Sequence, residues 1–272
     1  MHQALPARTH ARTLLVTLIG AFLVPGCNSG KHTNDSTADA SELDAPVALQ
    51  DAPGSTADTA LLLGDVDLGT AGTFAVLAGS AITNTGFTKI TGDVGISPGT
   101  TVTGFPDGEV INGAIYIADA KAAKAKLDLT TAYNNAAERV GAAVTVAGDL
   151  GGRMLTPGLY VSATTLEITV GDLTLDAGGD PFAIWVFQIG SSFTSANGSR
   201  IILANGANST NVFWQVGSST TIGIAAEMAG NFLTQVSITA QAGASVAGRL
   251  LTQNGAVTLE SNVVIRTIPI LL

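Results

Sequence analysis

Five short stretches of the chain repeat one pattern, in which a Gly or polar pair is followed by a small polar residue, an apolar residue and Thr. They are LAGSAIT (Leu77–Thr83), QIGSSFT (Gln188–Thr194), QVGSSTTI (Gln215–Ile222), TQVSIT (Thr234–Thr239) and TQNGAVT (Thr252–Thr258). Self-similarity of this kind is the sequence signature of stacked structural repeats. Because side chains alternate along a strand, the apolar residue of each copy points inward and the Thr outward. Stacked copies would line up one Thr per coil, which makes a surface suited to a periodic partner.

The spacing of four glutamines indicates the length of the repeat. The intervals shrink from 27 to 20 and then to 18 residues, between Gln188, Gln215, Gln235 and Gln253. An interval near 18 fits one coil of three strands of about four residues, joined by tight corners, with longer corner loops in the earlier coils. An antiparallel barrel or sandwich also has short strands at regular spacing. The repeated glutamines favour a triangular solenoid, because hairpins give no reason to repeat a three-strand unit.

One long segment, Gly113 to about Arg139, has helical periodicity. It is rich in Ala and contains no internal Gly or Pro. Apolar residues spaced by three and four form one stripe: Ile115, Ala118, Ala122, Ala125, Leu129, Ala132 and Ala136. Because the side chains of this stripe are small, we expect the helix to lie lengthwise against one side of the β structure.

Residues 1–26 have the features of an export signal. Arg8, His10 and Arg12 form a basic region, and Leu14–Val24 is an apolar stretch too short to cross a bilayer as a mature helix. The stretch ends at VPGC, which resembles a bacterial lipobox with Cys27 as the lipidated residue. The alternative is an ordinary secretory signal. We expect an exported protein, either a lipoprotein of the outer membrane or cell surface or a secreted protein.

Residues 27–62 are predicted to be a linker and residues 63–272 the folded domain. The linker is rich in Ser, Thr and Ala, and its six acidic residues between Asp35 and Asp58 are opposed by Lys31 alone. Few apolar residues and like charge cannot offset the cost of ordering a chain. We therefore expect a solvated, disordered spacer.

The folded part lacks the side chains that most catalytic sites need. All three histidines precede it, and Cys27 is the one cysteine. This excludes a Ser-His-Asp arrangement and a zinc site from the domain. From Phe182 to the end only Glu227 and Glu260 are acidic, which disfavours the paired-carboxylate clefts of glycosidases. We expect no enzymatic activity and no cofactor.

Two binding classes are also disfavoured. Nucleic-acid binding draws most of its affinity from clustered Lys and Arg, whereas this chain has a net charge of −9. Asp172, Asp176 and Asp180 recur every four residues near glycines, and such oxygen ligands suit calcium. Their spacing lacks the alternation of calcium loops, so we expect solvated turn residues and no metal site.

Seven segments of the folded part occur in an order typical of one family. They are LGTAGTFAVLAGSAITNTG (Leu68–Gly86), ITGDVGISPG (Ile90–Gly99), TVTGF (Thr101–Phe105), LTPGLY (Leu155–Tyr160), DPFAIWVFQIG (Asp180–Gly190), NVFWQVG (Asn211–Gly217) and GRLLTQNGAVTL (Gly248–Leu259). From about Leu63 to Pro269 the chain thus resembles the microbial ice-binding, or antifreeze, protein family. The resemblance implies an all-β-dominated, triangular, discontinuous, right-handed β-solenoid with one long helix packed alongside. It also implies adsorption to ice through one flat face, often rich in a Thr-(Ala/Gly)-x-(Thr/Asn) pattern.

That pattern occurs at Thr70–Thr73 and Thr85–Thr88 but is not repeated in the C-terminal coils. Strand alternation supplies a candidate face instead. With Ile82, Phe193, Ile222, Ile238 and Leu259 inward, the outward residues are Thr83, Thr194, Thr221, Thr239 and Thr258, with Ser192 and Ser237 two residues earlier. Coils stack at about 4.7–4.9 Å, near the oxygen repeat of an ice surface, and Thr is stiff at χ1. The alternative is that Thr simply suits a solvated sheet.

Two functions are consistent with the sequence. The first is an ice-binding protein of a cold-adapted organism, which inhibits ice growth or recrystallisation through this low-charge Thr/Ser face. Its partners would be the ice crystal surface and, if the lipobox is used, a membrane reached through the lipid on Cys27; we expect a monomer. The second is a cell-surface adhesion module that binds glycan or other cells. This function would suit the lipobox, the acidic spacer and the small number of matches to the Thr-(Ala/Gly)-x-(Thr/Asn) pattern.

Overall fold

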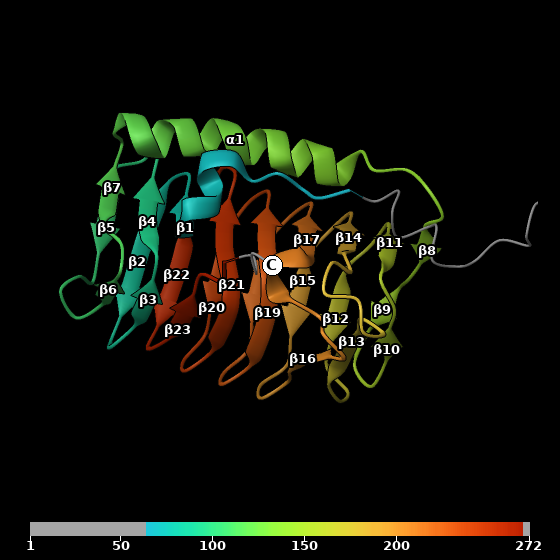
Figure 1. The fold of residues 1–272 in the computed structure, drawn as a ribbon. Helices are drawn as coiled ribbons and strands as arrows, with labels where there is room; N and C mark the ends of the chain where they lie inside the picture. The colour runs from blue at the N-terminus through green and yellow to red at the C-terminus, as the bar shows by residue number, and fades with distance from the viewer. Residues whose placement is uncertain (1–63, 269–272) are drawn as a thin grey trace, which may run out of the picture. The chain divides into compact units, whose positions relative to one another are not determined.

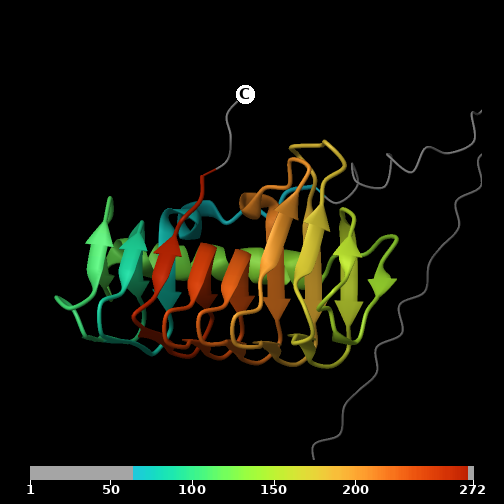
Figure 2. The ribbon, with the colours of Figure 1, turned by 90° about the horizontal axis from the view of Figure 1, so that it is seen from below.

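The computed structural model describes residues 64–268; the predicted signal, Cys27 and the linker lie outside them. The described residues form a solenoid whose coils contribute strands to three faces (Figures 1 and 2). Strands of neighbouring coils pair in parallel throughout this part of the chain. The predicted solenoid is therefore confirmed, and an antiparallel barrel or sandwich is excluded.

Each face is a row of strands, one from each coil. The helix face contains β7 (Ile115–Ile117), β4 (Asp93–Ile96), β1 (Phe74–Ala78), the second halves of β21 (Ser245–Thr252) and β19 (Glu227–Thr234), β17 (Val212–Val216), β14 (Trp185–Ile189), β11 (Gly158–Ser162) and β8 (Val144–Thr145). The second face, called the hydroxyl face below, contains β5 (Thr101–Thr103), β2 (Ala81–Thr85), β22 (Val257–Glu260), β20 (Ile238–Ala240), β18 (Thr220–Ile222), β15 (Phe193–Ser195), β12 (Leu166–Ile168) and β9 (Gly148–Asp149). The third face contains β6 (Glu109–Ile111), β3 (Lys89–Thr91), β23 (Val263–Ile265), the first halves of β21 and β19, β16 (Ile201–Ala204), β13 (Leu173–Asp176) and β10 (Met154–Leu155).

The coils are not stacked in chain order. β1, β2 and β3 pair with β21, β22 and β23, so the first coil of the chain stacks on the last. β5 to β7 close this end of the solenoid, β8 to β10 close the other, and α1 (Ala120–Ala137) runs between them (Figure 1). The helix is about 27 Å long, against about 38 Å for the eight strand spacings from β7 to β8. The discontinuity is thus bridged by a helix plus the extended chain that follows it.

The helix begins later than the sequence predicts. Residues 115–117 form β7 and pair with β4, and Ala118 has a φ of 47°. Asp119 then caps the helix, because its carboxylate accepts a hydrogen bond of 2.8 Å from the backbone N–H of Ala122. The rest of the predicted stripe is correct, since five of its residues are buried: Ala122, Ala125, Leu129, Ala132 and Ala136. Within residues 64–268 no helix combines the length and apolarity needed to cross a membrane.

Aromatic residues are sparse in the sequence, so the core is built mainly from aliphatic side chains, and four of the aromatic rings form one stack in it. Tyr160, Phe187, Trp214 and Phe232 come from successive coils, with ring centroids 5.2, 3.9 and 5.8 Å apart. Parallel, in-register stacking brings the same inward position of each coil together, so a few rings fill the centre. Aliphatic side chains fill the coils on either side of the stack.

Close contact between coils explains the glycines at two corners. A Cβ on Gly217 would lie 2.7 Å from the carbonyl oxygen of Gly190 in the next coil, at the corner between the helix face and the hydroxyl face. In the long strands β19 and β21, Gly230 and Gly248 have φ values of 114° and 152°, and a Cβ on Gly248 would overlap the backbone of Gly230. These two glycines turn the strands from the third face to the helix face.

The four glutamines do not share one register, contrary to the simplest form of the prediction. Gln188 pairs with Gln215, but Gln215 pairs with Leu233. Gln235 therefore lies two residues further along its coil, as does Gln253. A shift of two residues keeps a side chain on the same face of a strand, so the sequence repeat survives the slip. From β17 to β21, paired residues of successive coils are 18 positions apart. The predicted longer corners of the earlier coils are residues 177–184 and 205–211.

Candidate functional site: a ladder of hydroxyl groups on an open face

The strand register brings the predicted threonines into one row. Thr83 pairs with Thr258, Thr258 with Thr239, Thr239 with Thr221 and Thr221 with Thr194. Thr103 pairs with Thr83 and extends the row at one end; sequence reasoning missed it because its coil lacks the repeated corner pattern. We call these six residues the threonine row: Thr103, Thr83, Thr258, Thr239, Thr221 and Thr194.

The side chains of the threonine row face solvent. Their apolar neighbours are fully buried, as predicted: Ile82, Phe193, Ile222, Ile238 and Leu259. Thr103, Thr83 and Thr258 are exposed, and the other three are half-exposed. No hydroxyl of the row bonds to another group within residues 64–268. The hydroxyls are therefore available to water or to an external surface.

A second row of small side chains runs beside the first. Ser192 and Ser237 lie in it, as predicted, together with Thr165 and Ser219. The Thr165 and Ser192 hydroxyls are 3.0 Å apart, and those of Ser219 and Ser237 are 3.1 Å apart. Ser219 could have been found from the sequence, because aligning QIGSSFT with QVGSSTTI places it opposite Ser192. These bonds hold the second row in a fixed orientation beside the threonine row.

Two carboxylates end the threonine row. Glu167 pairs with Thr194, and Asp149 of β9 pairs with Glu167 in the coil that ends the stack. Burial alone would raise the pKa of Asp149. Hydrogen bonds from the Thr169 hydroxyl and from the backbone N–H groups of Thr169, Gly151 and Val170 outweigh it and lower that pKa to about 2. Asp149 therefore stays charged and fastens the end of the solenoid.

The two matches to the Thr-(Ala/Gly)-x-(Thr/Asn) pattern do not form the row. Residues 70–73 lie in the short helix η2 (Gly69–Thr73), where the Thr70 hydroxyl donates a hydrogen bond of 2.6 Å to Asp128 of α1. Hydrogen bonds from Lys124 and Thr70 lower the pKa of Asp128 to about 2. Of the second match, Thr85 is exposed on the hydroxyl face, but Thr88 is buried and accepts a bond from the backbone of Asn262.

The three aspartates near residue 176 are bound within the protein. Asp172 pairs with Arg200 at 2.7 Å, and this partner lowers the pKa of its carboxyl group. Asp176 accepts from Asn205, and Asp180 accepts from the backbone of Phe182, both at 2.8 Å. In the described part of the chain no three His, Cys, Asp or Glu side chains gather as metal ligands would.

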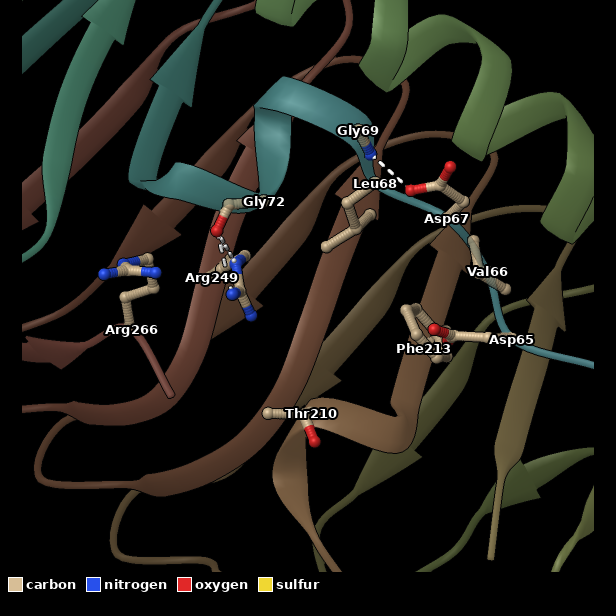
Figure 3. Close-up of a pocket in the computed structure, with 10 residues that line it drawn as sticks. All are labelled: Asp65, Val66, Asp67, Leu68, Gly69, Gly72, Thr210, Phe213, Arg249 and Arg266. Atoms are coloured by element: carbon tan, nitrogen blue, oxygen red, sulfur yellow. Dashed lines mark hydrogen bonds between the residues drawn. The ribbon is translucent and has the colours of Figure 1, made fainter. Parts of the chain in front are cut away.

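A pocket of about 220 Å³ lies away from the hydroxyl face, between residues 65–72 and strands β17 and β21 (Figure 3). Its buried cation, Arg249, donates to the carbonyl oxygens of Gly72 and Thr267 and to the side chain of Asn231. Burial, together with the charge of Arg266, lowers the pKa of Arg249 to about 10. Arg249 thus ties both ends of the described chain to the helix face.

The fold and the open ladder together define a class of protein: a discontinuous parallel solenoid with a helix on one face and an open, hydroxyl-lined face beside it. The chain belongs to the Ice-binding-like family, which it matches over residues 76–265. It is 47% identical to an ice-binding protein of Nostoc sp. (strain HG1), over 72% of each chain. It is 34% identical to an ice-binding protein of Flavobacterium frigoris (strain PS1), over 94% of this chain and 96% of that one.

A solved structure agrees with these relatives. An ice binding protein from an Antarctic biological consortium superimposes with a TM-score of 0.73 at 50% identity, over 74% of this chain and 91% of that one. The resemblance read from the sequence is therefore confirmed in both family and fold.

Proposed function

We propose that this protein adsorbs to ice through the hydroxyl face and so slows ice growth or recrystallisation. The observation that carries the proposal is the threonine row, in which six uncharged, β-branched side chains stand in register on consecutive strands. Strand spacing repeats them about every 4.8 Å, and their stiff χ1 angles leave little entropy to lose on docking. The relatives reported above are named for ice binding and not for a reaction.

Thermal hysteresis and ice-recrystallisation assays on the full chain test this proposal. Thr239→Tyr places a bulky ring in the middle of the row and should abolish most of the activity, because a flat face can no longer meet a flat crystal plane. Its melting temperature should stay within a degree or two of the parent, since outward changes of this kind cost about 0.5 kcal/mol or less.

Thr174→Tyr is the matched control, because Thr174 is an outward, half-exposed threonine of β13 on the third face. Equal losses in the two variants would show that the hydroxyl face is not the ice-binding face. A parent without effect on ice at high concentration would exclude the function, and binding to glycan or cells in that case would favour the adhesion hypothesis, which the names of the relatives do not support.

We also propose that the protein is exported and acts as a monomer, anchored through a lipid on Cys27. Support comes from the basic and apolar segments that precede Cys27 and from the acidic stretch that follows. In cells that express the full chain, the parent should incorporate labelled fatty acid and fractionate with membranes. Cys27→Ser should do neither while keeping its ice activity; unchanged fractionation of this variant would contradict the anchor and leave plain secretion.

A further inference from the structure

We propose that two unpartnered carboxylates, Glu167 and Glu260, limit the hydroxyl face, so that the native protein binds ice less strongly than its fold allows. The inference rests on the proposed function, because it assigns to these residues the boundary of the same face. It predicts a gain of activity instead of a loss.

Glu167 occupies a position of the threonine row without being a threonine. It is the central residue of β12, between the buried Leu166 and Ile168, and it pairs with Thr194 of the next coil. Its side chain is half-exposed and has no hydrogen bond or ion pair within residues 64–268. The threonine row, with its six neutral side chains, therefore stops at Thr194.

The neighbouring carboxylate, Asp149, differs in a decisive way. Four donors hold its carboxylate, at distances of 2.6 to 2.9 Å. Asp149 therefore stabilises the end of the solenoid, and replacing it would lower the stability of the protein. No such donor holds Glu167, so the identity of that side chain is not required by packing.

Glu260 lies on the same face, beside the middle of the row. It follows Thr258 by two residues on β22, so both side chains point outward, and it pairs with Thr85 of the next coil. The side chain is exposed, and within the described residues no partner binds its carboxylate. Glu260 thus flanks the centre of the threonine row, and Glu167 ends it.

A free carboxylate opposes binding to ice for a physical reason. It orders water molecules around its charge, and that hydration must be stripped or reoriented when a neutral crystal surface approaches. A threonine at the same place loses far less hydration free energy, because its hydroxyl is neutral and its methyl group is apolar. Replacing Glu167 with Thr would lengthen the neutral row from about 24 Å to about 29 Å, by one strand spacing.

The experiment compares Glu167→Thr, Glu260→Thr and the double variant with the parent, by thermal hysteresis at equal concentrations of the full chain. Glu167→Thr should raise thermal hysteresis by at least about one sixth, the share that a seventh residue adds to a row of six, and the double variant should raise it further. Glu109→Thr is the matched control, since Glu109 is an exposed glutamate of β6 on the third face; it removes the same charge and should leave activity unchanged.

Glu167→Gln keeps the length of the side chain and removes its charge, so it should give part of the gain if charge is the cause. Circular dichroism melting verifies that each variant is folded. If the parent is active and neither Thr variant exceeds it, the inference is wrong while the proposed function stands. If Glu109→Thr gains as much as Glu167→Thr, net charge and not the face is responsible, and the inference is again wrong. If no variant and no parent affects ice, both proposals fail.

Discussion

The helix face and the hydroxyl face are two sides of the same coils, but one is covered and the other is open. Most outward side chains of the helix face are large and apolar, and they are buried in one cluster with side chains of α1 and of residues 66–71: Leu77, Leu159, Val186, Phe213, Leu233 and Leu251. Outward side chains of the hydroxyl face are mostly small and hydroxylated, and those of the threonine row are exposed or half-exposed. The backbone is alike on both faces, so the chemistry of a few outward side chains decides which face recruits the helix and which stays free.

Polar contacts also hold the helix in place. Gln188 donates from its side-chain amide to the carbonyl oxygens of Ala136, Ala137 and Arg139, at 2.8 to 3.1 Å. These carbonyls lie at the C-terminal end of α1, where intrahelical partners are missing. Gln215 and Gln253 also donate to groups of α1, so three of the four repeated glutamines hold the helix on the covered face, whereas the repeated threonines belong to the open one.

The largest expected effect comes from breaking the apolar contact of the covered face. Leu129→Ala should lower the free energy of unfolding by about 2–5 kcal/mol, because Leu129 is fully buried between α1 and the sheet. Leu127→Ala is the control, since Leu127 is 68% exposed on the same helix, and it should cost about 0.5 kcal/mol or less. Urea denaturation measures both.

The same variant separates stability from function. Below its melting temperature, Leu129→Ala should keep the thermal hysteresis of the parent, because the hydroxyl face is unchanged. A loss of ice activity in the fully folded variant would show that the helix contributes to ice binding. The assignment of stability to one face and of ice binding to the other would then be wrong.

A smaller effect is expected from the polar contact at the end of the helix. Gln188→Leu should lower the free energy of unfolding by about 1 kcal/mol, because the released carbonyls are at the surface and water partly replaces the amide. Gln235→Leu is the control, since Gln235 is displaced in register from Gln188 and its side chain has no hydrogen bond within residues 64–268. If both changes cost the same, the bonds of Gln188 do not stabilise the helix end.

The smallest effect concerns pH at the end of the hydroxyl face. The pKa of Asp149 falls from 3.8 to about 2 in the folded protein, so its contribution to stability is complete above about pH 4 and is lost as pH falls toward 2. The melting temperature of Asp149→Asn should therefore fall less steeply than that of the parent between pH 5 and pH 2. Parallel curves would show that the four donors do not favour the charged form.

Local patterns predicted much of the candidate site, and nonlocal contacts account for what was missed. Alternation along a strand is a local property, so Thr239 and its predicted counterparts were assigned to the correct side of each strand. The start of α1 was wrong, because β7 exists only through its pairing with β4. The register slip at Gln235 was also missed, because a shift of two residues leaves the side-chain pattern unchanged.

The sequence by itself determined that the chain forms stacked coils, which residue of each copy is inward, and that the outward residue is a small hydroxyl, because these follow from a period of two within one strand. Only the tertiary structure decided that the first coil stacks on the last, that Thr103 completes the row, and that Glu167 occupies a threonine position at its end. These facts depend on which coils are neighbours, and that choice is made by the bridging helix and the parallel pairing between strands far apart in the chain.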